Sequence, residues 1–571
     1  MTAILNENEH TWAFFWQHMG SIYFVEMGRR EEVLRAVEEL ISRLELTESQ
    51  PFRVKAYERL WEVLASLPME KWLSFRSIEE SLSDIPGIGE GLRRTARELY
   101  ERGTTPLLEK LRAEVPDSVL ELRRLPGLGP QRIRKLWQEM GIVSIDSLAQ
   151  AIERGKLQNS EGWTPALIQR LAEGLAIYRQ QRHLLLYWEA SQIWQQAISP
   201  LQGRGLLVMP VGEFRRALPL ITQVEGLLST EGIALAEALG WKREASGNLL
   251  HPTLPVRLHL ADTRAWGRAL LAHTGPEFFW REMEKRLPPT AEAASEEALF
   301  ETVGLPYILP AWRDWEDVFD LAQRRQLPMP LDESHIKGSL HIHTTYSDGA
   351  DSLEVMVERA RQYGWKWIGI ADHSQRAAYA KGLPPQKLFQ QGEEIDLLNR
   401  RYQGSFFILK GVEADILPDG SVDYEEKVWK RLDFIIASIH EKLQMRKEEA
   451  MQRLERALSN PYVRVLGHWT GRLLRTRPGY PIDEERILAI CAERGIAIEF
   501  NANPYRMEID WRWVRRAAEY GVSIILTTDA HSVSELEYWK AGLSTLQKGL
   551  LPPNLLLNNS EYPPFAPTTE R

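Results

Sequence analysis

Imidazoles and carboxylates recur at matching places in the C-terminal part of the sequence, each just after a short apolar run. Imidazole nitrogen and carboxylate oxygen are the atoms that hold zinc, manganese or iron in proteins. The set is too large for one ion, and two or three ions that share a carboxylate fit it better. Such ions lower the pKa of bound water and stabilise the charge on a phosphoryl group under attack. The candidate ligands are His341, His343, Asp348, His373, Glu413, His440, His468, Asp529 and His531.

A single histidine at the end of a strand is more often a surface or hydrogen-bonded residue than a metal ligand. Of the 13 histidines, however, seven follow residue 330, and all of these except His335 occupy such a position. An acidic cluster without a cation would also repel itself and shift the pKa values of its members. The pattern therefore favours a metal centre.

Seven apolar runs must position these side chains. They alternate with amphipathic stretches such as Leu353–Tyr363 and Glu484–Arg494. Alternating strands and helices imply a parallel sheet with helices outside, and seven units predict a closed or nearly closed barrel. The carboxyl ends of its strands converge on one face, where active sites are built. The expected strands are Gly338–His341, Trp367–Ala371, Phe406–Val412, Phe434–Ser438, Val463–Leu466, Ile496–Phe500 and Ser523–Leu526.

Two short segments upstream repeat one pattern, Ile-Pro-Gly-Ile-Gly at Ile85–Gly89 and Leu-Pro-Gly-Leu-Gly at Leu125–Gly129. Each precedes a basic stretch with helical spacing, Leu92–Glu101 and Gln131–Met140. A tight Gly-x-Gly turn that enters a helix exposes backbone N–H groups, which can bind a phosphate without reading bases. Pro-Gly turns also cap helices elsewhere, so it is the matched pair that favours DNA binding. A third copy, Glu161–Pro165, lacks the second glycine and is expected to be structural. The candidate DNA contacts are Gly87, Gly89, Gly127, Gly129, Arg132 and Lys135.

Composition limits the class of protein. The 571 residues predict three or four domains, and 44% apolar with 26% charged residues is ordinary for folded domains. Because the net charge is −9, any DNA contact must come from local basic patches. The single cysteine, Cys491, excludes a disulfide framework and fits a reducing compartment. No apolar run approaches the roughly 20 residues of a membrane span, so we expect a cytoplasmic protein without a membrane partner.

The His341-x-His343 pair, followed by Ser347-Asp348-Gly349 and by the later histidines and carboxylates, resembles the polymerase and histidinol phosphatase (PHP) domain. The whole chain resembles the bacterial family X DNA polymerases that carry this domain at the C-terminus. The resemblance implies a multidomain fold. Its parts would be a helical region with helix-hairpin-helix motifs over 1–185, an α+β nucleotidyltransferase palm over 186–330, and a distorted (βα)7 PHP barrel over 331–571.

The family uses this barrel for manganese-dependent 3′–5′ exonuclease and related DNA-end phosphoesterase reactions. The resemblance therefore implies two or three divalent ions, with Mn²⁺ expected and Zn²⁺ or Fe²⁺ as alternatives. Glu499 and Asn501 are not family ligands and are expected to pack or to support ligands by hydrogen bonds. The residues expected to carry the chemistry are His341, His343, Glu413, His440 and Asp529.

The resemblance also implies how the ligands divide among the ions. The first ion would be held by His341, His343, Glu413 and Asp529. Glu413 would bridge to a second ion held by His440 and His468. The third ion would be held by Asp348, His373 and His531.

The family palm opens with Gly-Ser-x-Arg-Arg, and an Asp-x-Asp pair begins eleven residues after the glycine. Here Gly212–Arg216 reads Gly-Glu-Phe-Arg-Arg, and the pair is replaced by Gln223 and Glu225. Arg257 stands in the strand where the third carboxylate should lie. Because nucleotidyl transfer needs two magnesium ions held by carboxylates, we expect a degenerate palm that does not polymerise. Thr95 stands where the family can carry a Schiff-base lysine, which predicts that lyase activity is absent.

These observations predict a DNA-processing, metal-dependent phosphoesterase that hydrolyses DNA 3′ ends in repair and acts on ends, gaps or abasic sites. Arg472 and Arg475, which follow His468, either contact a substrate phosphate or are solvated loop cations. One alternative is a small-molecule phosphatase of the histidinol phosphatase kind, against which the DNA-binding turns argue. The other is a non-catalytic DNA-binding protein with structural metals, against which the open position at the strand ends and the surplus of ligands argue.

Overall fold

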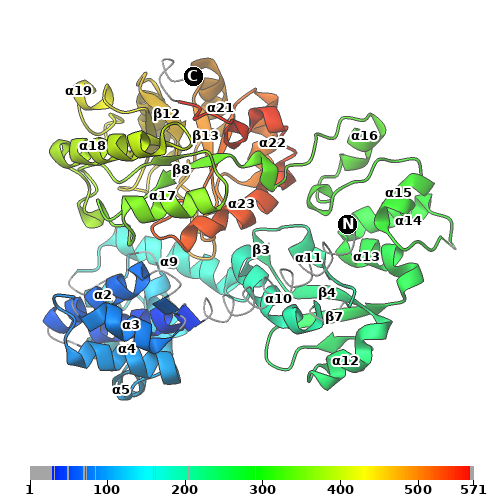
Figure 1. The fold of residues 1–571 in the computed structure, drawn as a ribbon, viewed down its shortest axis with the longest axis horizontal. Helices are drawn as coiled ribbons and strands as arrows, with labels where there is room; N and C mark the ends of the chain where they lie inside the picture. Colours follow the sequence, from blue (N-terminus) through cyan, green and yellow to red (C-terminus); the bar gives the residue numbers. More distant parts are fainter. Residues whose placement is uncertain are drawn as a thin grey trace, which may run out of the picture. The chain divides into compact units, whose positions relative to one another are not determined.

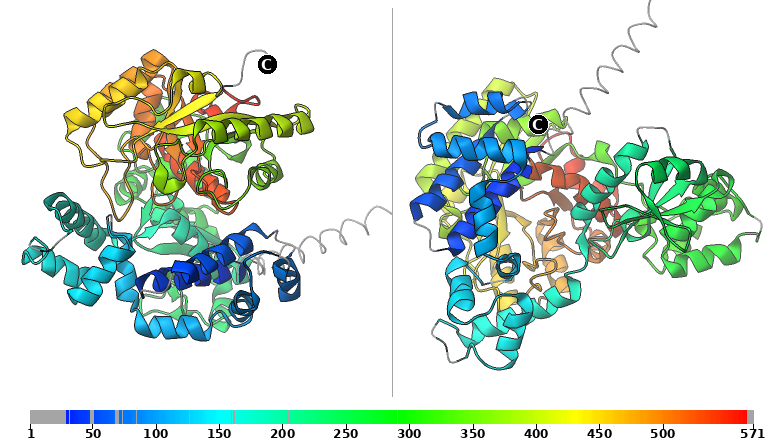
Figure 2. Two further views of the ribbon diagram at one scale, coloured as in Figure 1. Left: turned by 90° about the vertical axis from the view of Figure 1, so that its left-hand side faces the viewer. Right: turned by 90° about the horizontal axis from the view of Figure 1, so that it is seen from below.

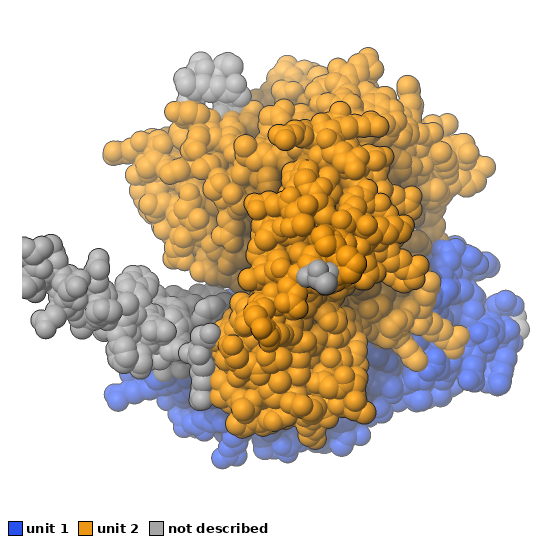
Figure 3. Space-filling view, turned by 90° about the vertical axis from the view of Figure 1, so that its right-hand side faces the viewer, with its two compact units in different colours: residues 1–176 blue, residues 177–571 orange. Residues whose placement is uncertain are grey.

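The computed structural model describes residues 29–565, with breaks at 31, 48–50, 68–70, 73, 84, 126, 159, 161, 203–205 and 290. Pro126 and Glu161, in the second and third repeated turns, lie outside the described residues. The chain divides into two compact units, residues 1–176 and 177–571 (Figure 3). None of the helices in the described part of the chain is long and apolar enough to span a bilayer.

The first unit is built from short helices around an apolar core that includes Leu40, Leu60 and Leu99 (Figure 1). This confirms the predicted helical N-terminal region. Residues 32–46 form its first long described helix. The following helices are α2 (Pro51–Ser66), α3 (Phe75–Ser83), α4 (Glu90–Arg102), α5 (Pro106–Glu114), α6 (Asp117–Glu121), α7 (Pro130–Arg134), α8 (Ile145–Glu153) and α9 (Pro165–Gln181), the last of which spans the boundary between the units.

Three turns in this unit share one backbone conformation. Gly87, Gly127 and Gly162 have φ angles of +90°, +87° and +88°, a left-handed region that glycine enters without a steric penalty. The apolar residue after each glycine is buried, as Trp163 is in the third turn, and a helix follows. The third turn thus copies the backbone of the other two although Thr164 replaces the second glycine.

The second unit begins with a mixed α/β region, as predicted. Its five-stranded sheet has the order β2-β4-β7-β6-β5, in which only β4 and β7 pair in parallel. Its strands are β2 (Val208–Val211), β4 (Val224–Ser229), β5 (Lys242–Arg243), β6 (Leu249–Leu250) and β7 (Val256–Ala261). Two further strands, β1 (Leu185–Leu186) and β3 (Leu220–Ile221), form a separate antiparallel pair. The helices are α10 (Tyr187–Gln202), α11 (Gly212–Arg215), α12 (Ile233–Ala238), α13 (Trp266–Thr274), α14 (Glu277–Arg286), α15 (Glu296–Thr302) and α16 (Val318–Gln323).

The C-terminal part of the second unit is a nearly closed barrel of parallel strands in the order β14-β13-β12-β11-β10-β9-β8, with helices outside (Figures 1 and 2). The predicted seven strand–helix units are confirmed, because every expected run overlaps an observed strand. The strands are β8 (Gly338–Ile342), β9 (Trp367–Ile370), β10 (Phe407–Asp415), β11 (Phe434–Ser438), β12 (Val463–Leu466), β13 (Ala497–Asn501) and β14 (Ile524–Thr527). The helices are α17 (Leu353–Gln362), α18 (Pro385–Tyr402), α19 (Glu426–Trp429), α20 (Lys447–Leu458), α21 (Glu484–Arg494), α22 (Trp511–Glu519) and α23 (Tyr538–Leu546).

The first and last strands, β8 and β14, are joined by side chains as well as by backbone. The Asn558 amide donates to the carbonyls of Gly338 (2.7 Å) and Leu526 (2.8 Å). Beyond the carboxyl ends of the two strands, the backbone N–H of His343 donates to the carbonyl of Ala530 (2.9 Å). These contacts hold the residues that follow β8 beside those that follow β14.

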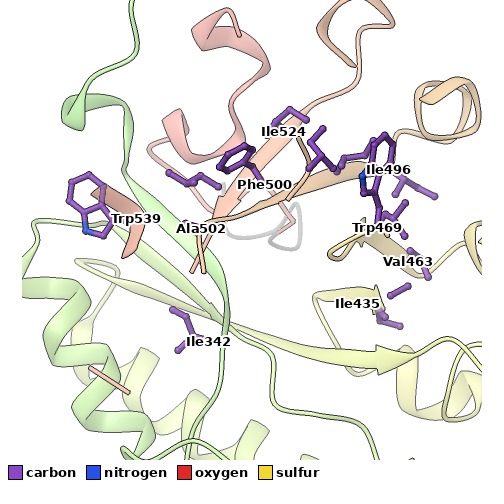
Figure 4. Close-up of a cluster of buried hydrophobic side chains, with 14 of the residues drawn as sticks. Ile342, Ile435, Val463, Trp469, Ile496, Phe500, Ala502, Ile524 and Trp539 are labelled. Carbon is purple, nitrogen blue, oxygen red and sulfur yellow. The ribbon is translucent and has the colours of Figure 1, made fainter. Parts of the chain in front are cut away.

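Side-chain alternation along the strands divides the barrel core into two layers. An inner cluster takes a residue from every strand, among them Leu340 and Leu409, and fills the barrel. An outer cluster, which includes Ile342 and Phe500, packs against the helices (Figure 4). Because successive residues of a strand face opposite sides, Glu413 shares the inner face of β10 with Leu409. Polar side chains at the carboxyl ends of the strands therefore gather at one end of the apolar inner core.

Candidate metal centre and nucleic-acid contacts

Glu413, two residues before the end of β10, lies at the centre of the predicted ligand set. Its Oε1 is 3.2 Å from His341 Nε2, 3.0 Å from His440 Nε2 and 2.8 Å from His468 Nε2. Its Oε2 is 3.0 Å from His373 Nδ1. Four strands of the barrel thus direct their terminal imidazoles at one carboxylate.

Asp529, which follows β14, is a second meeting point. Its Oδ1 lies 3.2 Å from His343 Nε2 and 3.5 Å from His341 Nε2. His341 and Asp529 both have left-handed backbone, with φ angles of +59° and +52°. Such strain in residues that bear side chains is typical of functional sites, where the surrounding structure fixes an otherwise unfavourable conformation.

The remaining predicted ligands lie on the other side of His343. Asp348 Oδ2 is 3.7 Å from His373 Nε2, and its Oδ1 is 3.5 Å from His531 Nε2. Among the residues that the structure describes, three groups of side chains have potential ligand atoms within 4.8 Å of one another: His343, Asp348, His373 and His531; His341, His343 and Asp529; His373, Glu413 and His440. His343 and His373 each belong to two groups, whereas the family resemblance assigns each of them to one ion.

Several potential ligand atoms are buried without a hydrogen-bond partner among the described residues. They include Nε2 of His341, both ring nitrogens of His343 and Oε2 of Glu413. These three side chains are at most 1% exposed. A buried polar atom without a partner costs free energy, which a bound cation would recover by accepting the lone pairs. The chemistry of the donor set therefore fits divalent cations.

The pKa shifts in the centre also fit the binding of divalent cations. Burial disfavours the charged form of Glu413, but His440 and His341 outweigh it and hold the pKa of Glu413 well below its usual value. Burial also opposes charge on His440, but Glu413 and Asp415 raise its pKa to about 10. The pKa of His343, by contrast, is lowered well below its usual value by burial and by neighbouring imidazoles. A bound cation would replace the positive charge that imidazole protons supply, so cation binding competes with protonation.

Glu499 and Asn501 support the ligands through hydrogen bonds, as expected from the sequence. Glu499 accepts hydrogen bonds from Nδ1 of His341 and, at 2.6 Å, from the backbone N–H of His468. The Asn501 amide donates to Asp529 Oδ2 (3.1 Å). A carboxylate on the far nitrogen of an imidazole fixes which ring nitrogen can bind a cation.

Asp415 plays the same part for His440 and was missed by sequence reasoning. Its Oδ1 is hydrogen-bonded to His440 Nδ1, which leaves Nε2 directed at Glu413. The signal was present, because Asp415 lies two residues beyond Glu413 on the same strand and hence on the same face.

Arg506, in the connection after β13, was also missed. Its Nε lies 3.2 Å from Asp529 Oδ2, whereas Nη1 is buried without a hydrogen-bond partner among the described residues. Burial opposes its charge, but Asp529 and other carboxylates outweigh burial and raise the pKa of Arg506. A cationic guanidinium with an unpaired N–H beside the ligands can bind an anionic oxygen. No sequence pattern distinguishes this loop arginine from others.

The two arginines proposed from sequence as phosphate contacts bind protein groups instead of facing an open site. Arg472 Nη1 donates to Asp510 (3.0 Å), and its Nε donates to the carbonyl of Arg506 (3.1 Å). Arg475 forms a two-pronged ion pair with Glu189 (2.8 and 2.9 Å). A role in phosphate binding stays a prediction for both.

In the mixed α/β region, Arg257 lies beside Gln223 and Glu225, the other two residues predicted from sequence to stand at the palm carboxylate positions. Parallel pairing of β4 with β7 sets Glu225 opposite Arg257. Arg257 Nη1 donates to Gln223 Oε1 (2.9 Å) and is 3.8 Å from Glu225 Oε1, while its Nε donates to Glu244 (3.1 Å). A hydrogen bond with His259 lowers the pKa of Glu225. The guanidinium of Arg257 thus occupies the space between the side chains of Gln223, Glu225 and Glu244.

The repeated turns place their second glycines at helix starts. Gly89 and Gly129 are the residues before the first turn of α4 and α7, with φ angles of −77° and −79°. Arg132 Nη1 donates to the Gly127 carbonyl (2.9 Å), and Lys135 begins a π-helical turn after α7. Their contact with DNA stays a prediction. Thr95 is buried on α4, and its hydroxyl donates to the Gly91 carbonyl.

Comparison with known proteins agrees with these features. Residues 339–503 match a family model described as the PHP domain, and residues 119–176 match one described as a SAM-like helix-hairpin-helix tandem. A Bacillus subtilis (strain 168) protein named DNA polymerase/3′-5′ exonuclease PolX is 30% identical over 565 residues, which cover 93% of this chain and 97% of that protein. Two proteins named as probable phosphatases match a smaller share of the chain. The one from Caldanaerobacter subterraneus subsp. tengcongensis is 30% identical over 38% of this chain and 86% of its own length. The one from Caldicellulosiruptor bescii is 28% identical over 38% of this chain and 90% of its own length.

Proposed function

Because the chain belongs to the PolX family of bacterial DNA polymerase/3′-5′ exonucleases, we propose that its barrel hydrolyses the phosphodiester at DNA 3′ ends as a metal-dependent exonuclease in DNA repair. The observation that carries the proposal is the convergence of imidazoles on Glu413, beside the group formed with Asp529. This donor set suits two or three divalent cations. Mn²⁺ is our first candidate because the family resemblance implies it, and Zn²⁺ or Fe²⁺ is the alternative because imidazole nitrogen suits these ions.

Each group of the centre has a task in this reaction. His341, His343, Glu413 and Asp529 would hold one ion, Glu413 with His440 and His468 would hold a second, and Asp348, His373 and His531 would hold a third. Bound ions supply a water of lowered pKa and positive charge beside the phosphoryl oxygens. Arg506 would also take part, since its unpaired Nη1 would donate to a phosphate oxygen. Asp415 and Glu499 keep the imidazoles in the tautomer that ligation requires.

The helix-hairpin-helix turns favour DNA over small substrates. A small-molecule phosphatase has no use for backbone N–H groups that bind phosphates, yet the helix-hairpin-helix match over 119–176 covers the second repeated turn. The phosphatase alternative rests on relatives that match only 38% of this chain. We therefore place DNA ends, gaps or abasic sites first as substrates.

We further propose that the palm no longer polymerises. Arg257 stands where an ion would need a carboxylate, and Gln223 offers only a neutral oxygen. A guanidinium repels divalent cations, so Glu225 alone would have to hold two of them. The palm then serves as a scaffold or DNA platform.

The deciding experiment compares release of nucleotides from 3′-labelled DNA with release of phosphate from histidinol phosphate, both in Mn²⁺. We expect nucleotide release from DNA, at least a hundredfold slower in His341→Ala and Asp529→Ala. His335→Ala, a histidine outside the centre, is the matched control and should act like the wild type. Unchanged hydrolysis in both ligand variants would refute the assignment. Faster hydrolysis of the small ester would favour the phosphatase, and DNA binding with no hydrolysis would favour a structural metal site.

A further inference from the structure

One loop at the mouth of the metal centre, residues 374–384, is fixed to the ligand-bearing strands. The Ser374 backbone N–H donates to the Glu413 carbonyl (3.0 Å), and the Leu383 N–H donates to the His373 carbonyl (2.9 Å). Ala377 and Ala380 are each only 1% exposed, so their buried side chains also hold the loop in place. Whatever this loop presents to solvent is therefore held at a fixed place relative to the ligands.

The loop presents Tyr379. Its side chain is 69% exposed, although it sits between the two buried anchors Ala377 and Ala380. The Tyr379 ring centroid lies 6.0 Å from that of His373 and 6.3 Å from that of His440. Those two imidazoles belong to one of the three groups that can hold a cation.

Isolated apolar side chains on a surface are common and need no function. Tyr379 differs from such a residue because its loop is anchored and because its ring borders two candidate ligands. A tyrosine has few rotatable bonds, so it offers a broad contact face at a small entropic cost. With its ring centroid 6.0 Å from that of His373, Tyr379 is within reach of the sugar and base of a nucleotide whose phosphate would occupy the centre.

We infer that Tyr379 is a specificity-determining residue that stacks on the terminal nucleoside of a DNA strand whose scissile phosphate lies at the His373, Glu413 and His440 group. This inference rests on the proposed exonuclease function and adds the subsite that recognises the leaving nucleoside. Base–aromatic stacking tolerates any base because each base has a π face. The subsite would favour polynucleotide ends over small phosphate esters without reading sequence.

The test uses two 3′-labelled single strands that differ only at the last residue, which is either an ordinary nucleotide or a tetrahydrofuran abasic sugar. We expect the wild-type protein to hydrolyse the base-bearing end with about 5- to 100-fold higher kcat/KM. Tyr379→Ala should abolish this preference by slowing only the base-bearing strand. Tyr379→Phe should keep it, because stacking needs no hydroxyl.

The matched control is Tyr562→Ala, an exposed tyrosine (53%) that packs beside Phe407 at the opposite, amino-terminal end of β10. It should leave both rates unchanged. A Tyr379→Ala variant that slows both strands equally, or that keeps the wild-type preference, would overturn the inference.

A second readout separates this inference from the proposed function. A strand that ends in 2-aminopurine is bound to the Asp529→Asn protein, and its fluorescence is expected to fall because of stacking. Adding Tyr379→Ala should restore the fluorescence by at least half, and undiminished quenching would overturn the inference. If the wild type hydrolyses neither strand while quenching still depends on Tyr379, the exonuclease proposal fails and the nucleoside subsite stands.

Discussion

Arg257 on β7 donates a hydrogen bond of 2.9 Å to the side chain of Gln223, immediately beside Glu225 on the neighbouring strand. The contact joins two of the residues that, in our proposal, replace carboxylates of the family palm. On that proposal, Arg257 brings a fixed positive charge to a place where polymerisation would require divalent cations. Gln223 and Arg257 are thus complementary, since the amide oxygen of Gln223 accepts a hydrogen bond from the guanidinium of Arg257.

The first prediction concerns polymerase activity. We expect no template-directed primer extension by the purified protein in Mg²⁺ or Mn²⁺, because Glu225 alone cannot hold two ions. The measurement is a gel assay with a labelled primer and all four nucleotides. It is made in the Asp529→Asn variant, so that hydrolysis of the 3′ end does not mask synthesis. Extension that disappears on Glu225→Ala would show that the palm is still active.

The second prediction concerns Asp415. Its carboxylate holds His440 through Nδ1, so Asp415→Asn is expected to weaken cation binding about 10- to 100-fold without unfolding the barrel. Calorimetric titration with Mn²⁺ measures the affinity, and circular dichroism checks the fold. Asp419→Asn, an exposed aspartate in the turn after β10, is the control and should bind Mn²⁺ like the wild type. Equal affinities for the three proteins would contradict a supporting role for Asp415.

The barrel was predictable from sequence because its strands are buried apolar runs of ordinary length, each closed by a polar residue. The same regularity placed Glu413 at a strand end. Asp415 could have been found from the two-residue period of that strand. Arg506 and Tyr379 could not have been found from sequence, because they lie in loops. The path of such a loop depends on its tertiary contacts and not on a repeating pattern. Counting along the family palm indicates Gln223, Glu225 and Arg257 as its three positions, whereas the register that sets Glu225 opposite Arg257 depends on how β4 and β7 pair.

The third prediction concerns the number of ions. His531 belongs to one candidate cation group, whereas His343 belongs to two. After loading with Mn²⁺ and desalting, we expect two or three ions per chain in the wild type, one fewer in His531→Ala, and a larger loss in His343→Ala. Elemental mass spectrometry gives the count, and His335→Ala should match the wild type. The same ion content in all four proteins would argue against these groups as the binding sites.

The fourth prediction concerns acid stability. Glu296 at the start of α15 is 2% exposed and pairs with Arg313 and Arg215. Burial disfavours its charge, but the two arginines outweigh burial and lower its pKa from 4.5 to about 2. Because the folded pKa lies below the unfolded one, the stabilisation is complete above about pH 4.5 and is lost as the pH falls towards 2. Linkage puts it at about 3 kcal/mol.

The substitution that tests this is Glu296→Gln. Thermal unfolding should show a lower Tm than the wild type at pH 7, with a difference that narrows below pH 4.5 as the wild-type carboxylate becomes protonated. Glu297→Gln, at the exposed neighbouring position, is the control and should leave Tm unchanged. A Tm difference for Glu296→Gln that stays constant from pH 7 to pH 3 would contradict the linkage.

The last prediction separates a DNA-binding role of the repeated turns from a structural one. Gly129 has ordinary backbone, with a φ angle of −79°, and an added Cβ would meet no atom within 4 Å. Gly129→Ala should therefore fold normally, but its methyl group would stand where a phosphate approaches the first N–H groups of α7. Gly127→Ala should instead destabilise the unit, because its φ is +87° and the new Cβ would lie 2.8 Å from Leu167. Anisotropy titrations with gapped DNA, together with thermal melts, should show several-fold weaker binding at unchanged Tm for Gly129→Ala. Wild-type affinity in that variant at every salt concentration would mean that this turn shapes the unit and does not contact DNA.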